Sequence, residues 1–165
     1  MMAELLQTFR FRVTLTRSAS NGPAGDAPDE LGDGAFAECS GLGLEADVKE
    51  YFEGGRNDGV VRRVGRVKLS PIVLKRGMFL AGDDELAEAE LWNWLTGMVS
   101  GVLPIPRYNG LVEVMAAGER VAARWSFDRG LPLKVSGPTL NARTGEIAVE
   151  ELHIVHEGLR LGLPS

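Results

Sequence analysis

Most of the information about the fold of this 165-residue chain lies in one run, Phe36-Ala-Glu-Cys-Ser-Gly-Leu-Gly-Leu-Glu-Ala-Asp-Val-Lys-Glu-Tyr-Phe-Glu-Gly-Gly55. Phe36 to Cys39 has strand character, and Leu44 to Phe52 alternates polar and apolar side chains as a half-buried strand does. The two predicted strands are separated by Ser40-Gly41-Leu42-Gly43, and Gly54-Gly55 predicts a turn after the second strand.

Three later segments continue the pattern along the chain. Lys68 to Phe79 (KLSPIVLKRGMF) predicts a strand that ends at an Arg-Gly turn. Glu90 to Leu95 (ELWNWL) predicts part of a helix that carries two tryptophans. Pro132, Ser136-Gly137-Pro138 and Ile147 to Leu152 predict a turn followed by a closing strand.

Taken in this order, the four segments resemble contractile phage tail tube proteins, a family that includes the inner tube proteins of extracellular contractile injection systems. The resemblance is carried by Ser40-Gly41-Leu42, Glu50-Tyr51, Gly54-Gly55 and the three later segments, and it covers most of the chain. It implies a structural subunit without catalytic residues, a cofactor or a metal. In that family, subunits form stacked hexameric rings inside a contractile sheath.

One segment departs from the family pattern. Arg17 to Gly34 (RSASNGPAGDAPDELGDG) consists mainly of Gly, Pro, Ala, Asp and Ser. Compared with the family, Ser18 to Gly34 is an insertion, because relatives pass almost directly from one strand to the next here. Such a segment buries too little apolar surface to offset the entropy lost on ordering. We therefore expect a flexible loop at residues 17–34 inside a single tail-tube-like domain of residues 1–165.

Hydrophobic periodicity predicts the other strands. Phe9 to Thr16 and Val60 to Leu74 alternate as strands, and Pro71 places the second on an edge or at a bulge. Leu111 to Met115 and Val121 to Phe127 predict a hairpin that closes through Ala117-Gly118-Glu119. The last predicted strands are Leu131 to Val135 and Ile147 to Leu161.

One helix is predicted, at Asp83 to Ser100. Asp83 or Asp84 can cap it, and its apolar stripe is Ala87, Leu91, Trp94, Leu95 and Met98. The pattern as a whole is mainly β: an antiparallel β-sandwich or barrel of about seven or eight strands with one packed α-helix. The resemblance relates this fold to phage tail tube and type VI secretion tube proteins.

Composition and the N-terminal sequence limit the compartments and partners that are expected for the protein. The single cysteine, Cys39, excludes an intrachain disulfide, and the formal charge of -5 argues against a dedicated nucleic-acid binder. Met1 to Arg12 lacks the features of a signal peptide, and no window approaches the ~18 apolar residues of a membrane span. We expect synthesis in a bacterial cytoplasm without a signal peptide, and no membrane insertion.

Several residues that could form a site favour structural roles. Gly41 to Ala46 (GLGLEA) matches a dinucleotide-binding fingerprint, but a strand and not a helix follows it. His153 and His156 are three residues apart on a predicted strand, where they point to opposite faces, so surface positions are favoured over metal ligation. Cys39 is predicted to be a small buried hydrophobe, and Trp92, Trp94 and Trp125 to belong to the core.

A basic segment is the most suggestive feature of the charge pattern. Between Arg56 and Arg76 the chain carries seven basic residues and one acid, Asp58, a local charge of +6 that leaves -11 elsewhere. Three interpretations are open: phosphate binding, a solvated face, and docking on an acidic surface of a neighbouring copy. The tube resemblance favours docking.

The sequence therefore predicts a structural subunit of the inner tube of a contractile injection apparatus, either a phage tail or an extracellular injection particle. Its partners would be itself in stacked hexameric rings, sheath and baseplate proteins, and a DNA or protein payload in the lumen, without specific nucleic-acid recognition. The insertion and the basic segment also fit a specialised tube-initiating ring near the baseplate. The alternative is a monomeric β-barrel binding module for nucleic acid or a small ligand.

The resemblance also places the contact between rings. In the tube family, the long hairpin that corresponds to about Leu44 to Lys68 contacts the adjacent ring, and the sheets of six subunits join edge to edge. The interface residues expected from the resemblance and the charge pattern are Glu50, Tyr51, Phe52, Glu53, Gly54, Gly55, Arg62, Arg63, Arg66 and Lys68.

Overall fold

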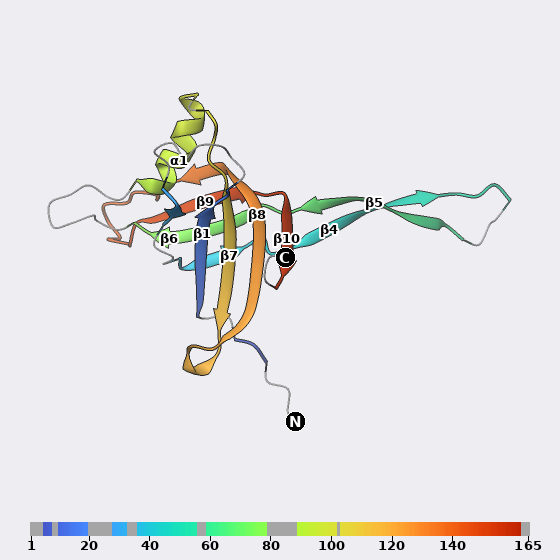
Figure 1. Ribbon diagram of the computed structural model, residues 1–165, viewed down its shortest axis with the longest axis horizontal. Coiled ribbons are helices and arrows are strands. Elements are labelled where there is room, and N and C mark those ends of the chain that lie inside the picture. The colour runs from blue at the N-terminus through green and yellow to red at the C-terminus, as the bar shows by residue number, and fades with distance from the viewer. Residues whose placement is uncertain are drawn as a thin grey trace.

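The computed structural model describes residues 5–7, 10–19, 28–32, 36–55, 59–78, 89–101 and 103–162. Within these residues the chain forms ten strands, one α-helix and one short 3₁₀ helix (Figure 1), which confirms the mainly β prediction. The elements are β1 (Phe11–Arg17), β2 (Glu30–Leu31), β3 (Glu38–Ser40), β4 (Leu44–Tyr51), β5 (Val61–Leu69), β6 (Ile72–Gly77), α1 (Glu90–Val99), β7 (Tyr108–Met115), η1 (Ala117–Glu119), β8 (Val121–Ser136), β9 (Val149–Val155) and β10 (Gly158–Leu161).

Eight of the strands form one antiparallel sheet, in the order β2-β1-β7-β8-β9-β6-β3, with β10 also paired to β8. The sixteen-residue strand β8 joins its two halves. Residues 121–130 of β8 pair with β7, whereas residues 131–136 pair with β9. In Figure 1, β1 and β7 run across the direction of β6 and β9, so the two halves of the sheet face each other.

The predicted separate strands at Val121 to Phe127 and Leu131 to Val135 are thus one bent strand. The bend lies at Arg129, which has a φ of 52°, and at Gly130. A Cβ atom on Gly130 would lie 2.7 Å from the Ile154 side chain and 2.9 Å from the carbonyl oxygen of Tyr108. The sequence pattern breaks here because the strand changes neighbours, not because it ends.

The core lies between the two halves of the sheet and under α1. Val13, Leu15 and Val112 from one half meet Ile72, Leu74, Leu152 and Ile154 from the other in a single buried cluster. Trp94 packs edge-on against Tyr108, with ring centroids 4.9 Å apart, and its indole N–H donates to the carbonyl oxygen of Pro106. The predicted core position of Trp94 is confirmed, while Trp125 is partly buried at the edge of the cluster.

The helix is shorter than predicted. It begins at Glu90, because Ala89 has dihedral angles of φ -113° and ψ 12°, which do not continue a helix backwards. The predicted caps Asp83 and Asp84, and Ala87 of the predicted stripe, lie outside the described residues. Leu91 and Trp94 are buried as predicted.

Part of the predicted loop at residues 17–34 packs on the body. Residues 20–27 and 33–35 lie outside the described residues, but β2 pairs with β1, and the side chain of Leu31 is buried. The hydroxyl of Tyr108 donates to the carbonyl oxygen of Pro28, and the Gly32 amide donates to the Glu90 carboxylate. Residues 28–32 therefore lie over the core beside the start of α1.

Candidate functional site

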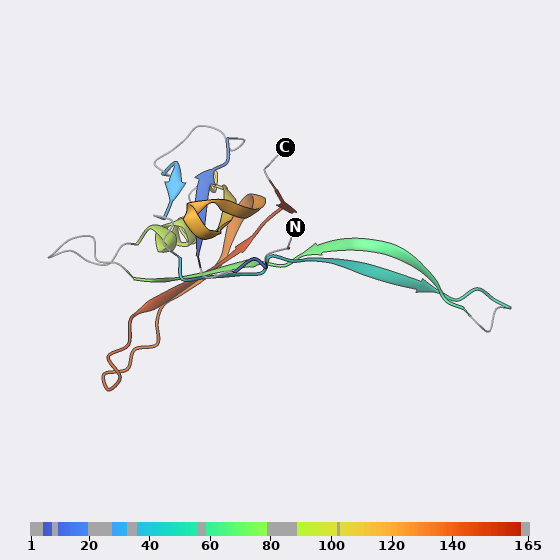
Figure 2. The ribbon, with the colours of Figure 1, turned by 90° about the horizontal axis from the view of Figure 1, so that it is seen from below.

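The strands β4 and β5 form a two-stranded sheet of their own. Figures 1 and 2 show this hairpin extending from one end of the body along the longest axis of the molecule. Among the described residues, neither strand has a second strand beside it, so both faces and both outer edges of the hairpin are open. Isolated two-stranded sheets are marginally stable in water, and open edges favour pairing with other chains.

The root of the hairpin explains why it leaves the body. The predicted single strand from Val60 to Leu74 is divided, because β5 ends at Leu69 and β6 begins at Ile72. Pro71 was predicted on an edge or at a bulge; β5 before it is an edge strand of the two-stranded sheet, whereas β6 after it lies between β9 and β3. Pro71 instead separates strands of two different sheets, and its carbonyl oxygen fills the space beside Gly41, where a Cβ atom would lie only 1.9 Å away.

One face of the hairpin is mainly apolar. Residues directly opposite each other in an antiparallel pair point to the same side, and the pairs Leu44↔Leu69, Ala46↔Val67 and Val48↔Val64 share one face. The bulge between Ala46 and Val48 lies in β5, where two residues oppose Asp47, so the alternation along β4 is unbroken and these pairs stay on one side. Leu44 and Val67 are each 59% exposed and Val48 is 55% exposed, so this apolar face is uncovered.

The opposite face is charged. Glu45 lies opposite Lys68 and Lys49 opposite Arg63, with Asp47 between Glu45 and Lys49 on the same side of β4. The Lys68 Nζ atom lies 2.8 Å from Asp47 on this face, and the Arg62 Nε atom lies 3.2 Å from Glu50 at the outer end of the apolar face. These side chains are largely exposed, so the ion pairs add at most about 1 kcal/mol each to stability. The charges therefore remain available to a partner.

The structure places the ten predicted interface residues on two faces and a tip. Tyr51, Arg63, Arg66 and Lys68 belong to the charged face, where the Arg63 guanidinium is 5.2 Å from the centre of the Tyr51 ring. Glu50 and Arg62 lie at the outer end of the apolar face. The other four residues follow β4 at the tip, and all ten are exposed. These four are Phe52, Glu53, Gly54 and Gly55.

The apolar face was missed in the sequence analysis. The alternation of Leu44 and Ala46 and of Val67 and Leu69 was visible, but such alternation ordinarily indicates the buried side of a strand. The structure brings these residues together on a face with no cover. Their exposure depends on where the hairpin points, which the local pattern does not contain.

His153 belongs to β9, whereas His156 follows the end of that strand at Val155, so the two do not share a strand, contrary to the prediction. His153 pairs with Glu151, and this hydrogen bond lowers the pKa of the Glu151 carboxyl. The surface prediction is wrong for His156, which is buried because the turn between β9 and β10 folds over the root of the hairpin. In the described part of the chain, no group of three His, Cys, Asp or Glu side chains could hold a metal.

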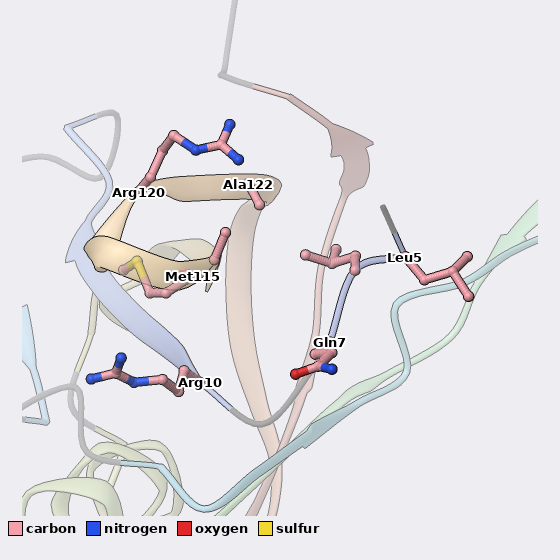
Figure 3. Close-up of a pocket in the computed structure, with 9 residues that line it drawn as sticks. Leu5, Gln7, Arg10, Met115, Arg120 and Ala122 are labelled. Atoms are coloured by element: carbon pink, nitrogen blue, oxygen red, sulfur yellow. The ribbon is translucent and has the colours of Figure 1, made fainter. Parts of the chain in front are cut away.

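The glycine fingerprint at residues 41–46 runs into strand β4, as predicted, so no helix N-terminus meets a phosphate there. A cavity of about 350 Å³ lies between the N-terminal segment and the turn that joins β7 to β8. Figure 3 shows the guanidinium groups of Arg10 and Arg120 on opposite sides of this hollow, so polar groups do not converge in it. Within the described ranges, no helix has the length and apolar composition to cross a membrane.

Cys39 is partly buried in β3, in line with the predicted structural role. Burial raises the pKa of its thiol from 9.0 to about 11. Since the thiolate is the reactive form, a shift of this size lowers the reactive fraction at pH 8 about 100-fold.

We expect iodoacetamide at about pH 8 to alkylate Cys39 about 100-fold more slowly in the folded protein than in urea. The folded rate should rise steeply as the pH approaches the thiol pKa of about 11. Mass spectrometry of quenched time points measures both rates. Equal rates in the folded and unfolded protein would contradict a buried thiol.

Comparison with known proteins bears on the whole chain. The family model described as T4-like virus tail tube protein gp19 matches residues 7–160. No curated protein matched the sequence. Three solved structures, two of an extracellular contractile injection system and one of the anti-feeding prophage, contain similar chains, all below 20% identity.

The first is from the PVC sheath-tube complex in the extended state, with a TM-score of 0.73 and 18% identity over 96% of this chain and 91% of that chain. The second is from the cap that terminates the tube of the anti-feeding prophage, with a TM-score of 0.74 and 19% identity over 99% of this chain and 95% of that chain. The third is from the PVC sheath/tube terminator in the extended state, with a TM-score of 0.73 and 19% identity over 99% of this chain and 100% of that chain. All three share the fold described above.

Proposed function

The chain belongs to the tail tube protein family of T4-like viruses, and from this premise we propose that it assembles into stacked hexameric rings that form the inner tube of a contractile injection apparatus. Its role is structural, and we assign it no catalytic activity. The alternative of an isolated binding module has no support, because the matching family consists of tube proteins.

The open hairpin β4–β5 is the observation that carries this proposal. An apolar face with 59% exposure at both Leu44 and Val67 is costly in water, and a partner that covers it recovers the hydrophobic free energy. A hairpin at one end of a body contacts a different surface on the next copy. Such heterologous contacts propagate into rings or filaments instead of closing as dimers.

Charge supports the same direction of assembly. The segment from Arg56 to Arg76 carries +6 and the rest of the chain -11, so contact between copies brings unlike charges together. We propose that Arg63, Arg66 and Lys68 on the charged face meet acidic surface of the next ring. The apolar face, with Arg62 at its outer end, then packs against the same neighbour or the adjacent one.

Lateral contacts within a ring have a separate basis. In the described part of the main sheet, β3 pairs only with β6, and residues 131–136 of β8 pair only with β9. These two open edges belong to the same half of the sheet. Pairing β3 of one copy with β8 of the next would continue the sheet around a ring and cover both of these edges.

The wider assembly follows from the family. We propose that sheath and baseplate proteins surround the tube, that a DNA or protein payload passes through its lumen, and that the particle is a phage tail or an extracellular injection particle. A tube-initiating ring near the baseplate and a main tube ring are both compatible with the hairpin and the residue 17–34 segment. A tube built of this subunit alone in the isolated particle would identify the main ring.

We expect the double substitution Arg62→Glu and Arg63→Glu to abolish stacked tubes while leaving the fold intact. The change reverses the charge that each hairpin presents and places an acid on the apolar face. Negative-stain electron microscopy across a salt series measures assembly, and circular dichroism with thermal unfolding checks the fold.

The matched control is Arg10→Glu with Arg120→Glu, which makes the same change in net charge at exposed positions beside β1 and β8. Tubes should persist in the control. Normal tubes from the Arg62 and Arg63 variant would refute the assigned interface, and loss of tubes in both variants would indicate a general effect of net charge.

A further inference from the structure

His156 occupies a buried position at the root of the hairpin. Its Nε2 atom lies 3.1 Å from the carbonyl oxygen of Ser70, the residue between β5 and Pro71. Its Nδ1 atom lies 3.1 Å from the carbonyl oxygen of Gly158, at the start of β10. The imidazole thus bridges the point where the hairpin leaves the body and the turn that follows β9.

Both neighbours of the ring nitrogens are acceptors, and this limits the protonation state that satisfies them. A carbonyl oxygen has no proton to give, so each hydrogen bond needs an N–H on the ring. A neutral imidazole has only one N–H, whereas the imidazolium has two. In the neutral form one ring nitrogen and one carbonyl oxygen therefore face each other with lone pairs on both.

The ring of Phe127 on β8 lies against the imidazole, with centroids 5.5 Å apart and planes tilted by 40°. The negative face of an aromatic ring favours a nearby cation. Several charged groups on the elements around His156 are engaged in ion pairs with one another. These pairs are Asp128 with Arg160, Glu157 with Arg107 and Arg129, and Lys68 with Asp47.

We propose that His156 is the positioning residue that fixes the root of the β4–β5 hairpin, and that it holds both carbonyl groups only when its imidazole is protonated. Protonation then sets the direction in which the hairpin leaves the body. When the ring becomes neutral, one of the two hydrogen bonds is lost and the root at Ser70 loosens. The use of the hairpin in ring contacts rests on the proposed function, but the hydrogen-bond geometry does not.

Hydrogen exchange measured by mass spectrometry tests this role on the full chain. Protection factors, which correct for the intrinsic pH dependence of exchange, are compared at about pH 5.5 and about pH 8. The reporting segments are residues 41–46 and 67–72, and β1 and β7 serve as internal reference. In the native sequence we expect root protection to fall about tenfold at the higher pH, with the reference unchanged.

Two variants separate this role from a general effect. In His156→Gln one amide N–H can serve one carbonyl at any pH, so root protection should be low at both pH values. His153→Gln removes the other histidine and should keep the native response. A native root with equal protection at both pH values would overturn the proposal, as would loss of the response in His153→Gln.

Equal protection of the native root at both pH values is measured without a variant, so this outcome does not depend on whether His156→Gln folds. Failure of the proposed function can be told apart from failure of the role assigned to His156. Absence of rings and tubes in electron microscopy would contradict assembly, whereas the exchange result reports only on the root of the hairpin.

Discussion

Replacing Gly41 with alanine is expected to lower the free energy of unfolding by about 3 kcal/mol or more and to displace the hairpin. Gly41 has a φ of 85°, which disfavours any residue with a Cβ atom. The added Cβ would also lie 1.9 Å from the Pro71 carbonyl oxygen and 3.2 Å from the Ile72 Cα atom. Both neighbours are backbone, so relief requires β4 and β5 to move apart where they leave the body.

Two other glycines of the hairpin separate the effect of the positive φ from the effect of the close approach to Pro71. Gly55 has a φ of 95° but open space around its Cα hydrogen, so Gly55→Ala should cost only the backbone strain, about 1–2 kcal/mol. Gly54 has open space and no such backbone angle, so Gly54→Ala should be neutral or slightly stabilising. Urea unfolding measures all three variants. A cost for Gly41→Ala no larger than that for Gly55→Ala would show that the close approach to Pro71 is not limiting.

Replacing Glu150 with alanine should destabilise the protein by about 3–5 kcal/mol. Glu150 and Arg76 are each 1% exposed, and the Arg76 Nε atom lies 2.6 Å from the carboxylate. The other carboxylate oxygen accepts the indole N–H of Trp92 on α1. The substitution therefore leaves a guanidinium in the core without this counter-charge and removes a link between α1 and the sheet.

The double variant Arg76→Met with Glu150→Leu tests whether the cost comes from the isolated charge. Apolar side chains of similar size often replace a buried ion pair with little loss, so the double variant should be more stable than Glu150→Ala. An exposed pair provides the comparison, since Asp47→Ala should change the free energy of unfolding by at most about 1 kcal/mol. If the changes in the free energy of unfolding caused by Arg76→Met alone and by Glu150→Leu alone add up to that of the double variant, Arg76 and Glu150 are not coupled.

The strands and the helix were largely accessible from local pattern. Alternation located β1, β4, β5 and β7, and Ala117-Gly118-Glu119 was correctly identified as the connection between β7 and β8. The buried pair of Arg76 and Glu150 was not accessible, because their partnership spans 74 residues and neither residue type indicates burial. His156 was misjudged for the same reason, since its partners Ser70 and Phe127 are distant in sequence.

The tube family itself could be identified from the order of short motifs. Ser40-Gly41-Leu42 and Glu50-Tyr51 are continuous in sequence, and the matching family model spans residues 7–160. The proposed interface residues were chosen from the resemblance and the charge pattern, but the two faces on which they lie follow from the register of β4 and β5, including the bulge opposite Asp47. A one-residue change in register would exchange those faces.

Alternation along β4 and β5 specified extended backbone with one apolar side, since strand periodicity depends only on residues two positions apart. Whether that side is buried depends on what lies beside it. The close contact between Gly41 and Pro71 directs the hairpin away from the core, and the Leu44 and Val67 face is left open. Burial is a sum over neighbours brought together from distant parts of the chain, and no local stretch of residues contains that sum.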